Sequence, residues 1–106
     1  MQTEPRTSIC AASVILRVLK GRWAAQVILA ISSGKSIHFS ALKRSIAGIS
    51  AKMLTEQLRY LERALVVSRQ PSAINQEVAY SLTARGREIK KVLDSFDDLA
   101  LRWEDL

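Results

Sequence analysis

The chain has a single cysteine and a single histidine among its 106 residues. Cys10 therefore has no disulfide partner within the chain, as is usual for proteins of a reducing cytosol. His38 has no second ligand-type residue beside it, so we expect a surface turn histidine and no metal site. No apolar run reaches the roughly 18 residues that a membrane helix needs, and the polar start Met1–Thr7 does not resemble a signal peptide. These absences predict a cytoplasmic protein with no membrane partner.

Residue sets that carry out catalysis are missing as well. The sequence contains no Ser–His–Asp set, no carboxylate pair and no glycine-rich phosphate loop, so we expect no enzyme, no catalytic residue and no cofactor. What is present is an excess of positive charge, with sixteen Lys and Arg against ten Asp and Glu. A net charge of +6 suits a polyanionic partner, although it fits DNA, RNA and an acidic protein about equally.

The chain is long enough for one domain, which we place at residues 8–106 after a flexible tail at residues 1–7. A first helix is predicted from near Ser8 to Leu19, stopped by Gly21. Its inner face is expected to hold five apolar residues: Ile9, Ala12, Ile15, Leu16 and Leu19. A second helix is predicted from Arg22 to Ile31.

The segment from Phe39 to Thr83 contains the most specific pattern. A short helix at about Ser40–Ser45 precedes a turn at Ile46–Ile49, and a second helix starts at Ser50. Ser50 can cap that helix. Ile49, just before the cap, can pack on Leu54, the first residue of the buried face of the helix. That face is predicted from leucines spaced three or four apart: Leu54, Leu58, Leu61 and Leu65.

Two strands follow this helix, at Val66–Arg69 and Val78–Leu82, around a turn that holds Pro71, Ser72 and Asn75. A short strand at Ile37-His38 is expected to join them as the third. The order of elements predicts a mainly α fold with a small β wing, a winged helix-turn-helix, in which the second helix of the motif reads double-stranded DNA.

Basic and short polar side chains of this motif are the candidate DNA contacts. Lys52 and Arg59 suit phosphates or guanine edges, and Thr55 suits a base or a thymine methyl group. Backbone N–H groups at the helix start suit a phosphate. Gln57 either reads a base or turns toward the domain, and Lys43 and Arg44 either bind phosphate or match the helix dipole. The candidate set is Ser50, Ala51, Lys52, Thr55, Gln57, Arg59, Lys43, Arg44 and, in the wing, Arg69.

The last helix is predicted from Thr83 or Ala84 almost to Leu106, with an apolar stripe nearly five turns long. The rest of so small a domain can cover only its first part. The remainder would be a large exposed apolar patch, which a symmetric homodimer would bury. The predicted dimer residues are Phe96, Leu99 and Trp103.

Four segments together resemble the HxlR-type winged helix-turn-helix regulators of bacteria, which are MarR-like. They are the Cys10…Trp23 spacing, His38–Leu42, Gly48–Glu62 and Val78–Gly86. The chain departs from the family pattern in having Ala11 for proline, His38 for arginine, Ala79 for glutamate, Leu65 for the glycine that ends the recognition helix, and a shorter wing turn without its late proline.

The resemblance implies a homodimeric transcriptional regulator that binds a pseudo-palindromic operator. It also implies control by a small electrophile or oxidant at Cys10, which lies at a helix start where the thiolate is stabilised. Two alternatives stay open. Cys10 could instead be a small buried hydrophobe at the dimer seam, and the domain could be a basic winged-helix adaptor for protein or RNA without a sensing role.

Overall fold

The computed structural model describes residues 8–71, 77–103 and 105, with side chains from Ala11 onward. The predicted tail at residues 1–7 and the wing-turn residues Ser72 and Asn75 lie outside this range. The elements, in chain order, are α1 (Ser8–Val18), α2 (Ala24–Ala30), β1 (Ser36–His38), α3 (Phe39–Ser45), α4 (Ala51–Arg63), β2 (Val67–Pro71), β3 (Val78–Leu82) and α5 (Ala84–Leu101). The predicted mainly α fold with a β wing is confirmed.

The core lies among α2, α3, α4 and the first half of α5. Three leucines of α4 at helical spacing, Leu54, Leu58 and Leu61, are almost fully buried, as predicted. They pack with α2, which contributes Val27 and Ile28. The helix-turn-helix is therefore held by the face of α4 that points inward, and its other face remains available.

The predicted second helix is shorter than expected. It begins at Ala24 rather than Arg22, because Gly21 has a positive φ of 84° and Trp23 serves as the N-cap residue. It ends at Ala30, since Ile31 is extended with ψ at 115°. Ile31 nevertheless points into the core and is fully buried.

The sheet has the strand order β1-β3-β2 and is antiparallel throughout. β1 joins the hairpin as predicted, with Ile37 opposite Tyr80. Pro71, expected in the turn, is instead the last residue of β2 and lies opposite Val78. β2 is an edge strand, where the missing N–H of proline leaves no ladder bond unmade.

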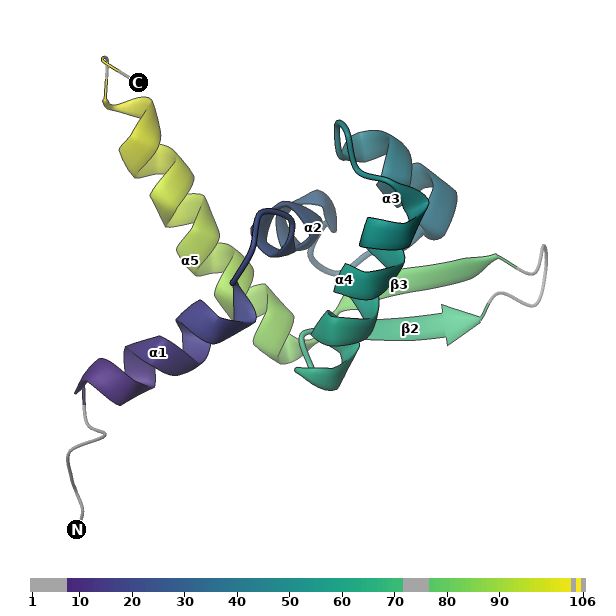
Figure 1. Ribbon diagram of the computed structural model, residues 1–106, viewed down its shortest axis with the longest axis horizontal. Coiled ribbons are helices and arrows are strands. Elements are labelled where there is room, and N and C mark those ends of the chain that lie inside the picture. Colours follow the sequence, from purple (N-terminus) through teal and green to yellow (C-terminus); the bar gives the residue numbers. More distant parts are fainter. Residues whose placement is uncertain (1–7, 72–76, 104, 106) are drawn as a thin grey trace, which may run out of the picture.

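α1 and α5 extend away from the winged body on the side opposite the hairpin (Figure 1). The prediction that α1 has a buried inner face is wrong for the single chain, because Ile15 and Leu16 are 40% and 63% exposed. α5 begins where predicted but ends at Leu101 rather than near Leu106. Its last turn tightens as Arg102 and Trp103 donate to carbonyls three residues back. Trp103 thus lies just beyond the helix, and Leu106 lies outside the described residues.

Candidate nucleic-acid interface

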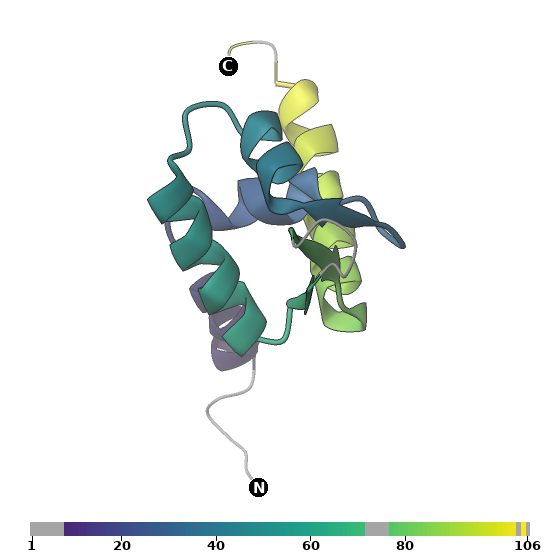
Figure 2. The same ribbon diagram turned by 90° about the vertical axis from the view of Figure 1, so that its right-hand side faces the viewer.

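The predicted recognition helix is α4, and its start has the expected cap. The Ser50 hydroxyl accepts a hydrogen bond of 3.1 Å from the backbone N–H of Met53. Ile49, just before the cap, is buried together with Leu54, as a hydrophobic staple requires. Gly48 in the preceding turn has a φ of 82°, which favours glycine. The outer flank of α4 lies along one side of the molecule in Figure 2.

Three cations occupy the outer face of α4. Lys52, Arg59 and Arg63 are exposed, and within the described part of the chain their side chains have no hydrogen-bond or ion-pair partner. Their spacing of seven and four residues places them on one face of a helix. Arg63 was missed in the sequence pattern, although the same spacing could have found it. This face offers free positive charge to an anionic surface.

The short polar residues of α4 are divided between two sides. Ala51 is exposed and Thr55 half-buried near the cationic face. Gln57 is half-buried, and its Oε1 is a buried atom that has no hydrogen-bond partner among the described residues. The orientation of Gln57 therefore favours the alternative in which it turns toward the domain, and its contact with DNA stays a prediction.

The remaining candidates lie on neighbouring elements. Lys43 and Arg44 are exposed in the last turn of α3, where their charges match the helix dipole and are also accessible to a phosphate. Arg69 is exposed on the edge strand β2, opposite Tyr80. The fold thus places cations on α3, α4 and the wing, the three elements of the motif that were predicted to touch DNA.

Cations of α5 have a different role. The sequence predicts Arg85 and Arg87 to be solvated, but each donates to a backbone carbonyl, Arg85 to Ala64 at 3.0 Å and Arg87 to Leu82 at 3.2 Å. Lys90 likewise donates to the carbonyl of Ile31 at 2.8 Å. These side chains satisfy carbonyls left free at the ends of elements, and no sequence pattern indicates such long-range partners.

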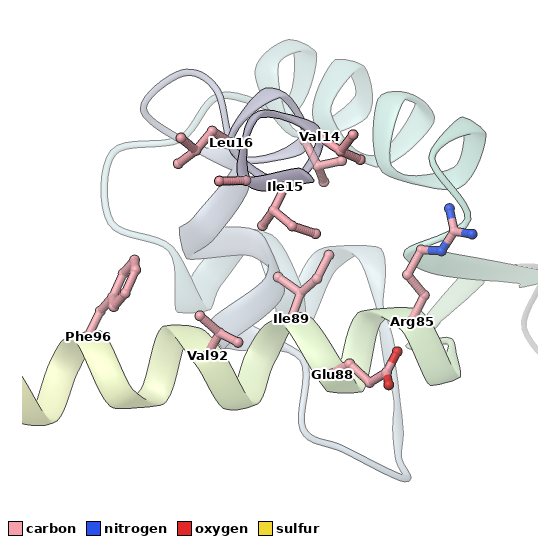
Figure 3. Close-up of a pocket in the computed structure, with 10 residues that line it drawn as sticks. Val14, Ile15, Leu16, Arg85, Glu88, Ile89, Val92 and Phe96 are labelled. Atoms are coloured by element: carbon pink, nitrogen blue, oxygen red, sulfur yellow. The ribbon is translucent and has the colours of Figure 1, made fainter. Parts of the chain in front are cut away.

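The apolar stripe of α5 is exposed beyond its first turns. Ile89 and Leu93 are buried, whereas the predicted dimer residues Phe96, Leu99 and Trp103 are 56%, 40% and 53% exposed. Between α5 and α1 runs an open groove of about 670 Å³, shown in Figure 3. It is lined by Ala12, Val14, Ile15, Leu16, Val18, Arg85, Glu88, Ile89, Val92 and Phe96.

Cys10 belongs to the first turn of α1, and its side chain lies outside the described part. α1 is joined to α4 through Tyr60, whose hydroxyl donates to the carbonyl of Arg17 at 2.7 Å. The ammonium of Lys20 lies 5.7 Å from the centre of the Tyr60 ring. The helix that carries the cysteine is therefore in contact with the last turn of the recognition helix.

The single histidine does not lie in a surface turn. His38 is the last residue of β1 and the N-cap of α3, and its buried Nδ1 has no partner among the described residues. No group of three or more acidic, histidine or cysteine side chains in the described ranges could hold a metal ion. No described helix is both long enough and apolar enough to span a bilayer.

A helix-turn-helix with a three-stranded wing and a cationic outer helix defines a winged helix-turn-helix protein. The family model of HxlR-like helix-turn-helix proteins matches residues 18–106. A helix-turn-helix-type transcriptional regulator of Methanothermobacter thermautotrophicus is 31% identical over 88 residues, covering 82% of this chain and 66% of that protein. The chain therefore belongs to the HxlR-like helix-turn-helix family of transcriptional regulators, and it spans about two thirds of this relative's length.

Solved structures of related regulators have the same fold as this chain. The chain matches the redox regulator HypR in its oxidized form with a TM-score of 0.80 and 26% identity, covering 92% of this chain and 100% of that one. It matches the quinone-bound YodB from Bacillus subtilis with a TM-score of 0.72 and 26% identity, covering 89% and 99%. The expected family and fold are thereby confirmed.

Proposed function

We propose that the protein is a homodimeric transcriptional regulator that binds a pseudo-palindromic DNA operator. The observation that supports this most directly is the outer face of α4, where Lys52, Arg59 and Arg63 have no partner in the described part of the chain. Free cations that replace the counterions of phosphates account for much of the affinity of DNA-binding proteins. A capped helix of thirteen residues is about 20 Å long and fits a major groove.

In the proposed complex the start of α4 enters the groove. Ser50 and Ala51 lie at a helix terminus whose free N–H groups attract a phosphate. Thr55 contacts a base, and Gln57 contributes only after turning outward. Lys43 and Arg44 of α3 and Arg69 of the wing contact the flanking backbone or minor groove.

The dimer is proposed from the exposed stripe of α5 and the facing residues of α1. Phe96 lines the α1–α5 groove, and Leu16 lies across from it on α1 (Figure 3). Leu99 and Trp103, farther along the chain, are also exposed. An apolar surface of this extent on a monomer marks a contact site. A second copy would supply an identical stripe, and its α4 would lie in a neighbouring half-site about one helical turn away.

Control through Cys10 is the third part of the proposal. Two of the similar structures are of a redox regulator in its oxidized form and of a quinone-bound regulator, and Cys10 lies on a helix that contacts α4 through Tyr60. Oxidation would join the Cys10 thiol to a second thiol, each losing a proton and together two electrons to the oxidant; a quinone would instead add to the thiolate. Either product changes the packing of α1.

Binding to nucleic acids in solution tests the main proposal. Fluorescence anisotropy is measured with a random 30-mer duplex and with single-stranded RNA of equal length, across a range of salt concentrations. We expect the duplex to bind more tightly and its affinity to fall steeply with salt. Tighter binding of the RNA, or no binding of either, would favour the adaptor that binds RNA or protein.

A further inference from the structure

The chain leaves α4 through a backbone conformation that leucine rarely adopts. Leu65 has a φ of 63°, in the left-handed region, which costs a residue with a side chain more than it costs glycine. The turn is closed by backbone bonds from Leu65 to Glu62 and from Val66 to Leu61, each 2.9 Å long. The Leu65 side chain is 61% exposed, so burial does little to offset this cost.

One side chain from the start of α5 holds this turn. The Thr83 hydroxyl donates to the carbonyl of Leu65 at 2.6 Å, and the carbonyl of Val66 lies 3.1 Å away. The same oxygen accepts from the backbone N–H of Gly86 at 3.1 Å, as the N-cap of α5. The backbone N–H of Thr83 also donates to Val66, at 3.0 Å. Thr83 therefore joins the end of one helix to the beginning of another.

Two neighbours of Thr83 bring the helices closer. The Arg85 guanidinium donates to the carbonyl of Ala64, the C-cap residue of α4. Gly86 is buried, and a side chain at this position would collide with the carbonyl oxygen of Val66. We call these contacts, between Ala64–Val66 and Thr83–Gly86, the α4–α5 joint.

We propose that the α4–α5 joint sets the direction of α4 relative to α5, and that Thr83 and Arg85 are positioning residues for operator binding. The inference rests on the proposed function, in which α5 forms the dimer and α4 enters the groove. α4 is about 20 Å long, so a tilt of about 10° at the joint moves its far end by about 3 Å, close to the rise of one base pair. The joint then determines which spacing of half-sites the dimer accepts.

The test uses duplexes that the wild-type protein selects from a random library. Each selected duplex is compared with versions whose centre is longer or shorter by one and two base pairs, and with a duplex that contains one half-site. Thr83→Val keeps the β-branched shape and removes the hydroxyl, and Thr83→Ser restores it. Arg85→Ala removes the bond to Ala64 together with one charge that lines the α1–α5 groove, so the oligomeric state of this variant is measured beside its DNA binding.

We expect Thr83→Val to lower affinity for duplexes of the selected spacing roughly tenfold, which corresponds to the net free energy of one hydrogen bond. Affinity for the single half-site should stay the same, discrimination between spacings should flatten, and Thr83→Ser should behave as wild type. Arg85→Ala should reduce the difference in affinity between spacings as well, but by less. If Thr83→Val does not fold, Arg85→Ala is the variant that tests the role of the joint. Unchanged spacing discrimination in the folded variants would overturn the role of the joint alone. A wild-type protein indifferent to spacing would overturn the proposed paired operator, and the joint's role with it.

Discussion

The hydroxyl of Tyr60, in the last turn of α4, donates a hydrogen bond of 2.7 Å to the carbonyl of Arg17, in the last turn of α1. This bond connects the helix proposed to read DNA with the helix that carries Cys10. A modification that shifts α1 would therefore act directly on α4 through this hydrogen bond. A displacement of a few ångströms would misalign half-sites that are fixed by the pitch of DNA.

The first prediction concerns Cys10 and this hydrogen bond. Diamide or a quinone should weaken operator binding by the wild-type protein, and Cys10→Ser should bind DNA but ignore the oxidant. Tyr60→Phe removes only the hydroxyl, so it should keep binding in reducing buffer and respond several-fold less to the oxidant. Affinity is measured by anisotropy, with thiol modification followed by mass spectrometry. If Cys10 in the native dimer stays unmodified, it is the small hydrophobe of the alternative interpretation.

The second prediction tests the face of α4. Lys52→Ala and Arg59→Ala should each weaken duplex binding and lower the slope of log affinity against log salt by about one. Thr55→Ala should change sequence preference more than affinity, since it is expected to contact a base. Lys91→Ala, an exposed cation on α5, is the control for loss of charge alone. An unchanged affinity in a folded Lys52→Ala, Arg59→Ala double variant would remove α4 from the interface.

The third prediction separates the wing from the recognition helix. Arg69→Ala should lower affinity alike for many duplex sequences, because phosphate and minor-groove contacts carry little base information. Gln70→Ala, at the next exposed position of β2, is the matched control. A loss confined to one base position would show that Arg69 reads a base directly, and no loss would leave the hairpin a structural element.

The fourth prediction concerns the dimer. Phe96→Asp combined with Trp103→Asp places charges in a seam that is expected to be apolar, so the variant should be a monomer or precipitate. Lys91→Asp introduces the same acidic side chain on another face of α5 and should leave the dimer intact. Light scattering at micromolar concentration gives the mass. A monomeric wild-type protein under these conditions would contradict the dimer.

The fifth prediction concerns the strain at Leu65. Leu65→Gly should raise the free energy of unfolding by about 1 kcal/mol, because glycine adopts a positive φ without steric cost. Leu65→Ala keeps a β-carbon and should not stabilise the protein, which makes it the matched control. Denaturant unfolding is compared at one protein concentration, since dimer stability depends on it. Equal stability of the glycine and alanine variants would mean that the left-handed conformation costs little.

Local patterns in the sequence were sufficient to predict the helix-turn-helix. Helix periodicity and capping act between residues at most four or five positions apart. The burial of Leu54, Leu58 and Leu61 and the Ser50 cap therefore follow from the α4 segment itself. The apolar stripe on α5 was predictable from the same local periodicity. Its exposure was predictable because the stripe is longer than one small domain can cover.

Tertiary structure decided the features that depend on residues distant in the sequence. Leu65 was expected in the buried face by its spacing, but the joint with Thr83 holds it left-handed and exposed. Arg85 was expected in solvent, yet it binds the carbonyl of Ala64 across the joint. The link from Tyr60 to Arg17 had no counterpart in any motif. The periodicity of a segment specifies which of its faces is apolar, whereas the partner that each side chain meets is set by how the helices pack.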